Sequence, residues 1–434
     1  MRSVSIFRSG CLLLAAAVLG GCGGSSGDSN QAHIRILNVS PGYNSLDLYV
    51  NNGDDDTDTQ KASSVGFETL TDYVSLDSDT YTIKFKRAGV TSTLLSAGGQ
   101  ELTDDSHTTY VAFGSTGKFA IQKISEDVKD ADDNKSTVTI INTAEAGSLD
   151  VYITDTDVNL SDTTPQFSSV ASGSPSAATT LDSGTYRLRV TGAGDNTDLR
   201  LDVPSVTLDS KKVVTIILTS TQGGVLVNAL VLPQQGSLTI NHNTKARVRA
   251  ANGIANGSAV TATVGGVSVL AGQPVGVIGN KYEQVDAGSV EVNLSVDGNP
   301  VSVANQTLTA GGDYTLLVWS DSTGTRTSLI TDDNHEPSAS TKTKIRLLNG
   351  MSGLGRPISL NVDFGPVVDN IAVGTASPFA EVASGSDTRL DINDAVTSTT
   401  LTTLTSVSLQ QSAVYTVFMS GSGTAPGSTV RRDR

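Results

Sequence analysis

The chain repeats one pattern four times, at intervals of about one hundred residues, and this repetition limits what it can fold into. Each copy opens with a short apolar run that ends at an Asn, and a turn and a second run of alternating apolar residues follow. Alternation with a period of two predicts β-strands with one buried face. The opening runs are residues 34–38, 138–142, 248–252 and 345–349, and the second runs are residues 46–50, 149–153, 260–264 and 358–362.

Each copy also closes with an apolar run rich in Tyr, Val, Thr and Ile, which are residues typical of strands. Beyond residue 21 we find no convincing amphipathic stretch of helical period. Short strands at regular spacing, separated by Gly, Ser and Thr turns, predict an all-β chain with one β-sandwich in each copy. The closing runs are residues 110–113, 213–218, 314–319 and 415–419, and the predicted sandwiches are residues 32–126, 136–233, 245–332 and 343–428.

The segments between the copies are polar and have the composition of linkers. They are residues 125–136, 233–244 and 332–343, and the first of them is highly charged. These segments predict a string of modules with limited contact between neighbours, roughly 150 Å long if extended. We expect the C-terminal Arg431–Arg434 segment to be a frayed tail.

The N-terminus predicts export and lipid attachment. Residues 1–21 combine Arg2 and Arg8 with an apolar stretch that is too short to span a bilayer, as in a secretory signal peptide. The sequence that ends at Cys22 resembles the bacterial lipobox, in which the cysteine thiol receives a diacylglycerol before cleavage. The alternative is an ordinary secretory signal with a chance cysteine. Residues 22–31 then form a Gly- and Ser-rich tether, and Gly23 in place of an aspartate favours the outer membrane, facing the periplasm or the cell surface.

Composition excludes several classes of protein. The formal charge of −15 argues against a nucleic-acid-binding face, which is normally basic. Two cysteines cannot build a disulfide scaffold. If Cys11 leaves with the signal and Cys22 is acylated, no thiol remains, so each module must be stabilised by its core alone.

The opening of the first copy resembles a bacterial domain family of unknown function, DUF4397. The resemblance rests on Ile34–Pro41, which includes an Arg and a Ser-Pro turn, and on the Asp-x-Tyr sequence within Leu46–Val50. The second copy keeps Leu149–Tyr152 but lacks Ser-Pro, and copies three and four keep the pattern without Asp-x-Tyr. The resemblance implies an immunoglobulin-like sandwich in an exported or anchored protein, and it implies no activity.

Acidic residues provide the candidate metal ligands. Asp54, Asp56 and Asp58 alternate just after a strand, and Asp130 and Asp132 lie in the first linker. Several carboxylates in one loop can bind Ca²⁺, but the EF-hand pattern is absent. The alternative is a solvated acidic loop. The four histidines are expected to be exposed or at strand edges, because none has a second His or Cys at ligand spacing.

Two recurring residue types allow both a structural and a binding interpretation. Asp47 and Asp150 occupy one position in copies one and two, and we expect them to be structural hydrogen-bonding groups rather than markers of a binding face. The tyrosines of the alternating strands pack in the core or form a sugar-stacking platform, and core packing is the expectation. These tyrosines are Tyr49, Tyr81, Tyr152 and Tyr186.

We therefore expect a lipid-anchored protein of the cell envelope that acts as a non-catalytic binding or structural array of modules. The membrane is the expected partner, through the acyl chains on Cys22, and an envelope protein or a glycan is a further candidate. No cofactor is expected apart from possible Ca²⁺. A Ca²⁺-dependent adhesin or glycan-binding protein is the alternative, and a hydrolase or its accessory subunit is a more distant one.

Overall fold

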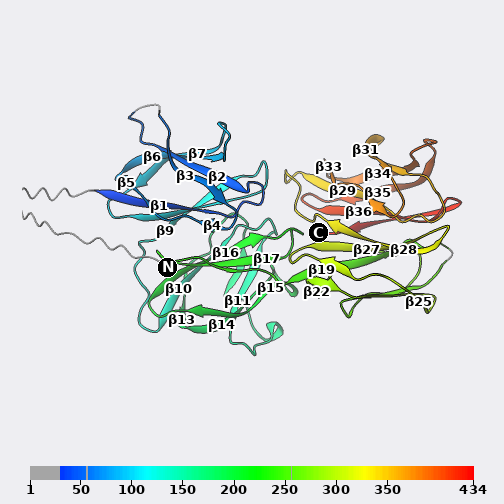
Figure 1. Cartoon of the computed structure of the whole chain (residues 1–434), viewed down its shortest axis with the longest axis horizontal. Helices are drawn as coiled ribbons and strands as arrows, with labels where there is room; N and C mark the ends of the chain where they lie inside the picture. The colour runs from blue at the N-terminus through cyan, green and yellow to red at the C-terminus, as the bar shows by residue number, and fades with distance from the viewer. Residues whose placement is uncertain (1–29, 55–56, 256) are drawn as a thin grey trace, which may run out of the picture.

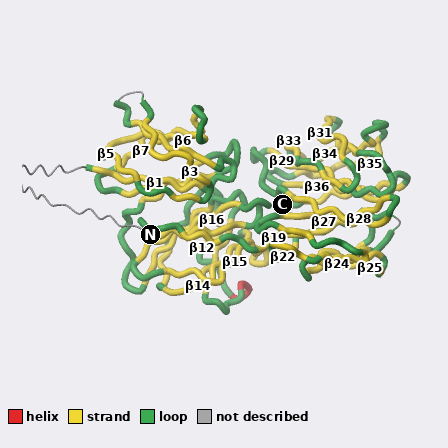
Figure 2. The backbone as a smooth tube through the Cα atoms, in the orientation of Figure 1, coloured by secondary structure: helices red, strands yellow, loops and turns green. Residues whose placement is uncertain are grey.

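A computed structural model describes residues 30–54, 57–255 and 257–434. Within these ranges the chain is nearly all β-strand, and its helical structure there is limited to one short 3-10 helix, η1 (Leu160–Asp162). The all-β prediction is confirmed (Figure 2). Among the described residues, we find no helix that is long and apolar enough to cross a membrane.

In every repeat, the opening and closing strands lie parallel and side by side in one sheet, which we call the inner sheet. The second run of the repeat lies in a facing sheet, the outer sheet, whose strands pair antiparallel. The interior between the two sheets of each repeat holds one hydrophobic cluster. Each repeat is therefore a β-sandwich, as its alternating sequence predicts.

The first two repeats have the following strands, in pairing order. The first inner sheet is β4 (Thr69–Leu70), β1 (Gln31–Asn38), β8 (His107–Phe113) and β9 (Ala120–Ser125), with β5 (Val74–Asp77) also on β1; its outer sheet is β3 (Thr59–Gly66), β2 (Ser45–Asn51), β6 (Asp79–Arg87) and β7 (Thr93–Leu102). The second inner sheet is β13 (Thr179–Asp182), β10 (Lys135–Asn142), β16 (Lys212–Ser220), β17 (Val227–Pro233) and β18 (Thr239–Asn241); its outer sheet is β12 (Phe167–Val170), β11 (Leu149–Thr154), β14 (Gly184–Gly192) and β15 (Asp195–Leu208).

The third and fourth repeats follow the same plan. The third inner sheet is β22 (Glu283–Asp286), β19 (Lys245–Asn252), β27 (Asp313–Asp321) and β28 (Gly324–Asp332); its outer sheet is β21 (Val267–Gln273), β20 (Val260–Val264), β24 (Val292–Val296) and β25 (Asn299–Val301), and β23 (Gly288–Val290) pairs with β26 (Gln306–Leu308). The fourth inner sheet is β32 (Thr375–Ala376), β29 (Lys342–Asn349), β36 (Val414–Ser422) and β37 (Ala425–Arg432), with β33 (Ala380–Ala383) also on β29; its outer sheet is β31 (Gly365–Ile371), β30 (Ile358–Val362), β34 (Gly385–Asp394) and β35 (Thr400–Leu409).

The Asn that ends each opening strand ties the inner sheet to the outer sheet. Asn38, at the end of β1, is fully buried, and its Nδ2 donates to the carbonyls of Tyr43 and Val65. Its Oδ1 accepts from the amide of Ser40 two residues later. Equivalent bonds recur at Asn142, Asn252 and Asn349. A buried amide that satisfies several backbone groups explains why Asn recurs at this position.

The repeats pack in pairs through their inner sheets, so the predicted string with limited contact between modules is wrong (Figure 1). One cluster joins the inner sheets of repeats one and two, and it includes Leu37, Val111 and Ile217. A second cluster joins repeats three and four, around Leu317 and Phe418. The reason is that the inner-sheet strands carry apolar residues on both faces, so one sandwich alone cannot bury them.

Candidate functional site

The outer sheet of the fourth repeat carries a hollow of about 580 Å³ on the face turned away from its core. This volume lies in the roughly 300–1,000 Å³ range of small-molecule pockets. Neighbouring strands supply its floor, since Asn361 of β30 pairs with Asp391 of β34, and Asp391 in turn pairs with Thr403 of β35. We call it the Phe364 hollow, and its lining is Ser359, Asn361, Phe364, Pro366, Val368, Asp369, Arg389, Asp391, Asn393, Asp394, Ala395, Ser398 and Thr400.

A small side chain on the floor of the hollow stands where two other repeats have a tyrosine. Asn361 occupies the place in its strand that Tyr49 holds in the first repeat and Tyr152 in the second. Tyr152 is almost fully buried in its outer sheet, and the Tyr49 ring lies 4.1 Å from the Nζ of Lys86. An Asn leaves much of the space of such a ring open. In the third repeat the same position is Thr263.

Phe364 stands at the rim in an unusual backbone conformation. The two residues of the β30–β31 turn, Asp363 and Phe364, have φ angles of 46° and 68°. A two-residue hairpin turn with both φ angles positive favours Gly or Asn, and the third repeat has Gly265 and Gly266 there. A bulky residue in the left-handed region costs roughly 1–2 kcal/mol. Phe364 is nevertheless 74 % exposed, the largest exposed fraction among the large hydrophobic residues of the described chain.

A charged pair crosses the floor of the hollow next to this ring. The guanidinium of Arg389 lies 5.0 Å from the centroid of Phe364 and donates to both carboxylate oxygens of Asp391, at 2.8 Å each. Thr403 also donates to Asp391, at 2.6 Å. The bond from Arg389, together with its charge, keeps the pKa of Asp391 below its ordinary value although burial opposes this shift. The pair is therefore fixed and charged at neutral pH.

Other polar groups in the hollow retain unused hydrogen-bonding capacity. Within the described ranges, no hydrogen-bond partner is found for the side chains of Ser359, Asn361 or Asp369. Asn393 accepts a bond from Thr400 through its Oδ1, at 2.9 Å. Donors and acceptors thus face an open space beside an exposed aromatic ring, which is an arrangement that can hold a small polar ligand.

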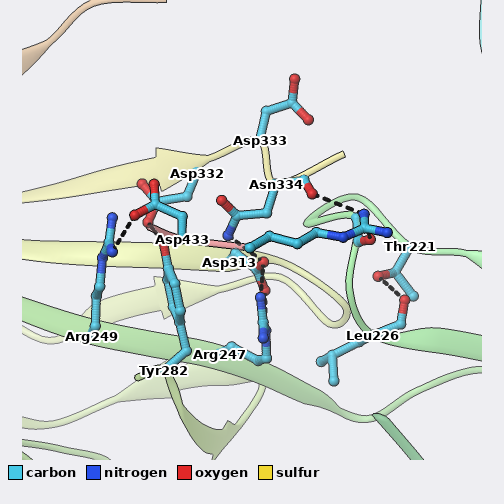
Figure 3. A network of polar contacts seen from close by, with 12 residues as sticks. Thr221, Leu226, Arg247, Arg249, Tyr282, Asp313, Asp332, Asp333, Asn334 and Asp433 are labelled. Carbon is cyan, nitrogen blue, oxygen red and sulfur yellow. Dashed lines mark hydrogen bonds and ion pairs between the residues drawn. The ribbon is translucent and has the colours of Figure 1, made fainter. Parts of the chain in front are cut away.

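A second polar constellation lies between the third and fourth repeats, and it is buried (Figure 3). Arg249 of the third repeat pairs with Asp433 of the fourth at 2.5 Å, and Arg346 of the fourth pairs with Asp332 of the third at 2.6 Å. All four side chains are at most 1 % exposed. The hydroxyl of Tyr282 donates to Asp332 at 2.7 Å. This exchange of buried ion pairs joins two sandwiches, so we assign it a structural role.

The first repeat contains the same motif without the exchange. Arg35 pairs with Glu126 at 2.7 Å, and its Nε donates to Thr109 at 2.8 Å. Glu126 also accepts from the amide of Gln235 in the second repeat, at 2.5 Å. An aromatic ring lies over the guanidinium of each buried arginine, namely Arg35, Arg249 and Arg346. The distance from the Arg35 guanidinium to the centroid of Tyr73 is 4.4 Å. Residues of the predicted linkers, including Glu126 and Asp332, are therefore buried at contacts between repeats.

The C-terminal segment is also ordered by these contacts, so the expectation of a frayed tail is wrong. Arg434 donates to the carbonyls of Gly224 and Asn334, at 3.1 Å each, and pairs with Glu336 at 2.8 Å. Burial lowers the pKa of Arg434 to about 10. The last residues thus link the fourth repeat to the second and third.

The comparisons with known proteins bear on the family. The model of the family described as Domain of unknown function (DUF4397) matches residues 32–152 and 246–356, which is more than half of the chain. The chain belongs to the DUF4397 family. No curated protein matches it. A solved structure of a family 26 carbohydrate-binding module, from Eubacterium rectale Amy13K in complex with maltoheptaose, covers 47 % of this chain and 97 % of its own at 12 % identity, with a TM-score of 0.16.

The acidic loops of this DUF4397 protein are only partly described. Asp58 pairs with Lys84 at 2.6 Å and with Lys86 at 3.3 Å, whereas Asp54 accepts a bond from Asn52 at 2.7 Å. Asp56 and Cys22 lie outside the described residues. Asp130 and Asp132 are exposed, and the described ranges hold no group of three metal-binding side chains. Calcium binding by these residues stays a prediction.

The recurring Asp residues have structural partners. Asp47 accepts from the amide of Ser64 at 2.8 Å, and Asp150 accepts from the amides of Ser169 and Gly194 at 2.6 and 2.8 Å. These bonds agree with the structural interpretation of both residues. Phe364 was not among the residues predicted from the sequence, although one signal pointed to it: an aromatic residue stands in a turn where another copy has two glycines.

Proposed function

We propose that this DUF4397 protein is a lipid-anchored, non-catalytic binding protein of the cell envelope. Acyl chains on Cys22 would attach one end, and the packed sandwiches would present a binding surface. The outer membrane is the proposed site of attachment, with the folded part facing the periplasm or the cell surface.

The observation that carries the binding role is the Phe364 hollow. It lies on the open face of an outer sheet and combines an exposed ring with polar groups that lack partners in the described structure. Figure 1 supports presentation away from the anchor, because β1 begins at one end of the long axis and the outer sheet of the fourth repeat lies towards the other. Packing of the repeats against one another would hold this surface at the end of the body that is remote from β1.

Lipid attachment is tested by metabolic labelling with an alkyne analogue of palmitate in a Gram-negative host. We expect the full chain to take up the label and to sediment with outer membranes. Cys22→Ser should remove the label and leave residues 1–21 uncleaved, because cleavage follows acylation, so this variant should no longer sediment with outer membranes. Cys11→Ser should change neither the label nor the fraction. Label that persists in Cys22→Ser would contradict the anchoring proposal.

A further inference from the structure

We propose that the Phe364 hollow binds a neutral carbohydrate, with a sugar ring against Phe364 and its hydroxyl groups bonded to Asn361 and the Arg389–Asp391 pair. This inference rests on the proposed binding function and names its ligand class. A pyranose ring has an apolar face of C–H groups and a rim of hydroxyls that both donate and accept. The hollow offers the complement of both features.

The aromatic component is an exposed ring at a position that disfavours it. Phe364 is 74 % exposed and has a φ of 68° in a turn where the third repeat has glycine. Side chains held in rare backbone conformations are concentrated at functional sites, where the surrounding structure over-determines them. The guanidinium of Arg389 lies over one side of the ring, 5.0 Å from its centroid. An exposed aromatic face suits stacking against the apolar face of a sugar.

The polar component matches hydroxyl groups better than a protein surface. Asn361 supplies an unpaired carboxamide, Ser359 an unpaired hydroxyl, and the Arg389–Asp391 pair a fixed donor and acceptor within the described part of the chain. The cores of protein–protein interfaces are enriched in apolar residues and depleted in charge. The lining of this hollow is mostly polar. A polyhydroxylated ligand is therefore favoured over a peptide segment.

The charge of the hollow selects against acidic polysaccharides. Asp369, Asp391 and Asp394 line it, and Arg389 is the one cationic side chain among the lining residues. Arg356 pairs with Asp394 at 2.6 Å, so a negative charge remains near the opening after both pairs are counted. An anionic polymer would be repelled, whereas an uncharged sugar would not.

The residues that the other repeats have at positions 361 and 364 supply the substitutions for the test. Asn361→Tyr introduces the residue of repeats one and two and should fill the hollow, and Phe364→Gly introduces the residue of repeat three and should remove the ring. Neither change removes a core side chain. Phe364→Gly also relieves the backbone strain, so it should melt at or above the temperature of the parent protein while losing the ligand. Val128→Ala, at a residue that is 48 % exposed and outside the hollow, is the matched control.

The experiment is affinity electrophoresis of the mature chain carrying Cys22→Ser, in gels containing soluble starch, mixed-linkage β-glucan, galactomannan, arabinoxylan or alginate. We expect at least one neutral polysaccharide to retard the protein and alginate to have no effect. Phe364→Gly and Asn361→Tyr should each weaken the retardation at least tenfold, and Val128→Ala should leave it unchanged.

Two results would overturn the inference. If no neutral polysaccharide retards the protein, the ligand class is wrong, and the labelling of Cys22 still decides the anchoring proposal independently. If retardation persists in both Phe364→Gly and Asn361→Tyr, the carbohydrate binds elsewhere on the molecule. Thermal melting of each variant shows whether it is folded, so that a loss of binding is not confused with a loss of structure.

Discussion

At the residue scale, the buried arginines of the opening strands decide how the repeats combine. Arg249 and Arg346 occupy the same position in their repeats, and each pairs with a carboxylate of the neighbouring repeat. The second repeat has Thr139 at this position, so within the described residues the first pair of sandwiches has one buried ion pair of this kind, Arg35–Glu126. A buried charge is tolerated only with a partner, and in the second pair that partner belongs to the other sandwich.

Removal of one arginine should therefore destabilise the second pair of sandwiches. In Arg346→Ala, the carboxylate of Asp332 loses its ion pair while it stays buried, and this loss should cost about 3–5 kcal/mol. Urea unfolding followed by circular dichroism measures the change. Lys211→Ala removes an exposed ion pair with Asp133 and should leave the unfolding midpoint nearly unchanged. Equal effects of the two variants would contradict the role that we assign to burial.

The arginines themselves were visible in the sequence, but their partners were not. Arg35 stands out in an apolar run, and yet Glu126 lies 91 residues away in a segment whose composition is that of a linker. Local composition cannot reveal a pairing of such separation, because it depends on how the sheets close. For the same reason, the sequence did not predict that Asp433, which follows the last strand, is buried.

At the element scale, each outer sheet contains a bulge in the strand that directly follows the second run of its repeat. These strands are β3, β12, β21 and β31. One residue of that strand has a positive φ in every repeat: Ser64, Ser169, Gly272 and Asn370. A bulge adds one residue and strengthens the local twist. Asp47 and Asp150 bond to the amide of this residue in the first two repeats, and the hydroxyl of Thr261 does so in the third.

This bulge predicts a position-specific effect of β-branched residues. Gly272 has a φ of 61°, so Gly272→Val should destabilise the third repeat by about 1–2 kcal/mol. Ala271→Val changes the preceding residue of β21, which is exposed and does not have a positive φ, and should have little effect. Denaturant unfolding of both variants tests the prediction. If Gly272→Val were as stable as Ala271→Val, the strained backbone would not be required.

The strands were the part of the fold that the sequence predicted best. Alternation marked outer-sheet strands such as β20 and β30, because only one face of each is fully buried. The closing strands carry a different signal, since Val213–Leu218 is almost continuously apolar. In the structure, Ile216 lies in the core of the second repeat and Ile217 in the cluster shared with the first. We predicted separate modules, although a continuous apolar run such as this one is what a strand with two buried faces requires.

At the scale of the whole molecule, the two pairs of sandwiches are also joined to each other. The amide of Gly223 in the second repeat donates to the carbonyl of Gly311 in the third at 2.8 Å, and the side chain of Gln284 in the third repeat donates to the carbonyl of Leu199 in the second. At the same junction, Arg434, which follows the last strand of the fourth repeat, donates to the carbonyl of Gly224 in the second. The molecule is consequently a compact body of four repeats, and the outer sheet that carries the Phe364 hollow lies towards one end of it (Figure 1).

Small-angle X-ray scattering can distinguish this body from an extended string. A compact chain of this length has a radius of gyration of about 22 Å, and an extended string of four modules would reach roughly 150 Å in length. We expect the mature chain with Cys22→Ser to scatter as the compact form.

Ile217→Asp places a charge in the cluster between repeats one and two, and it should increase the radius of gyration by opening that pair. Thr197→Asp, a change at an exposed position of β15 outside the cluster, should not. A mature chain with a maximum dimension near 150 Å would contradict the packed arrangement, and the hollow would then be presented on a flexible arm.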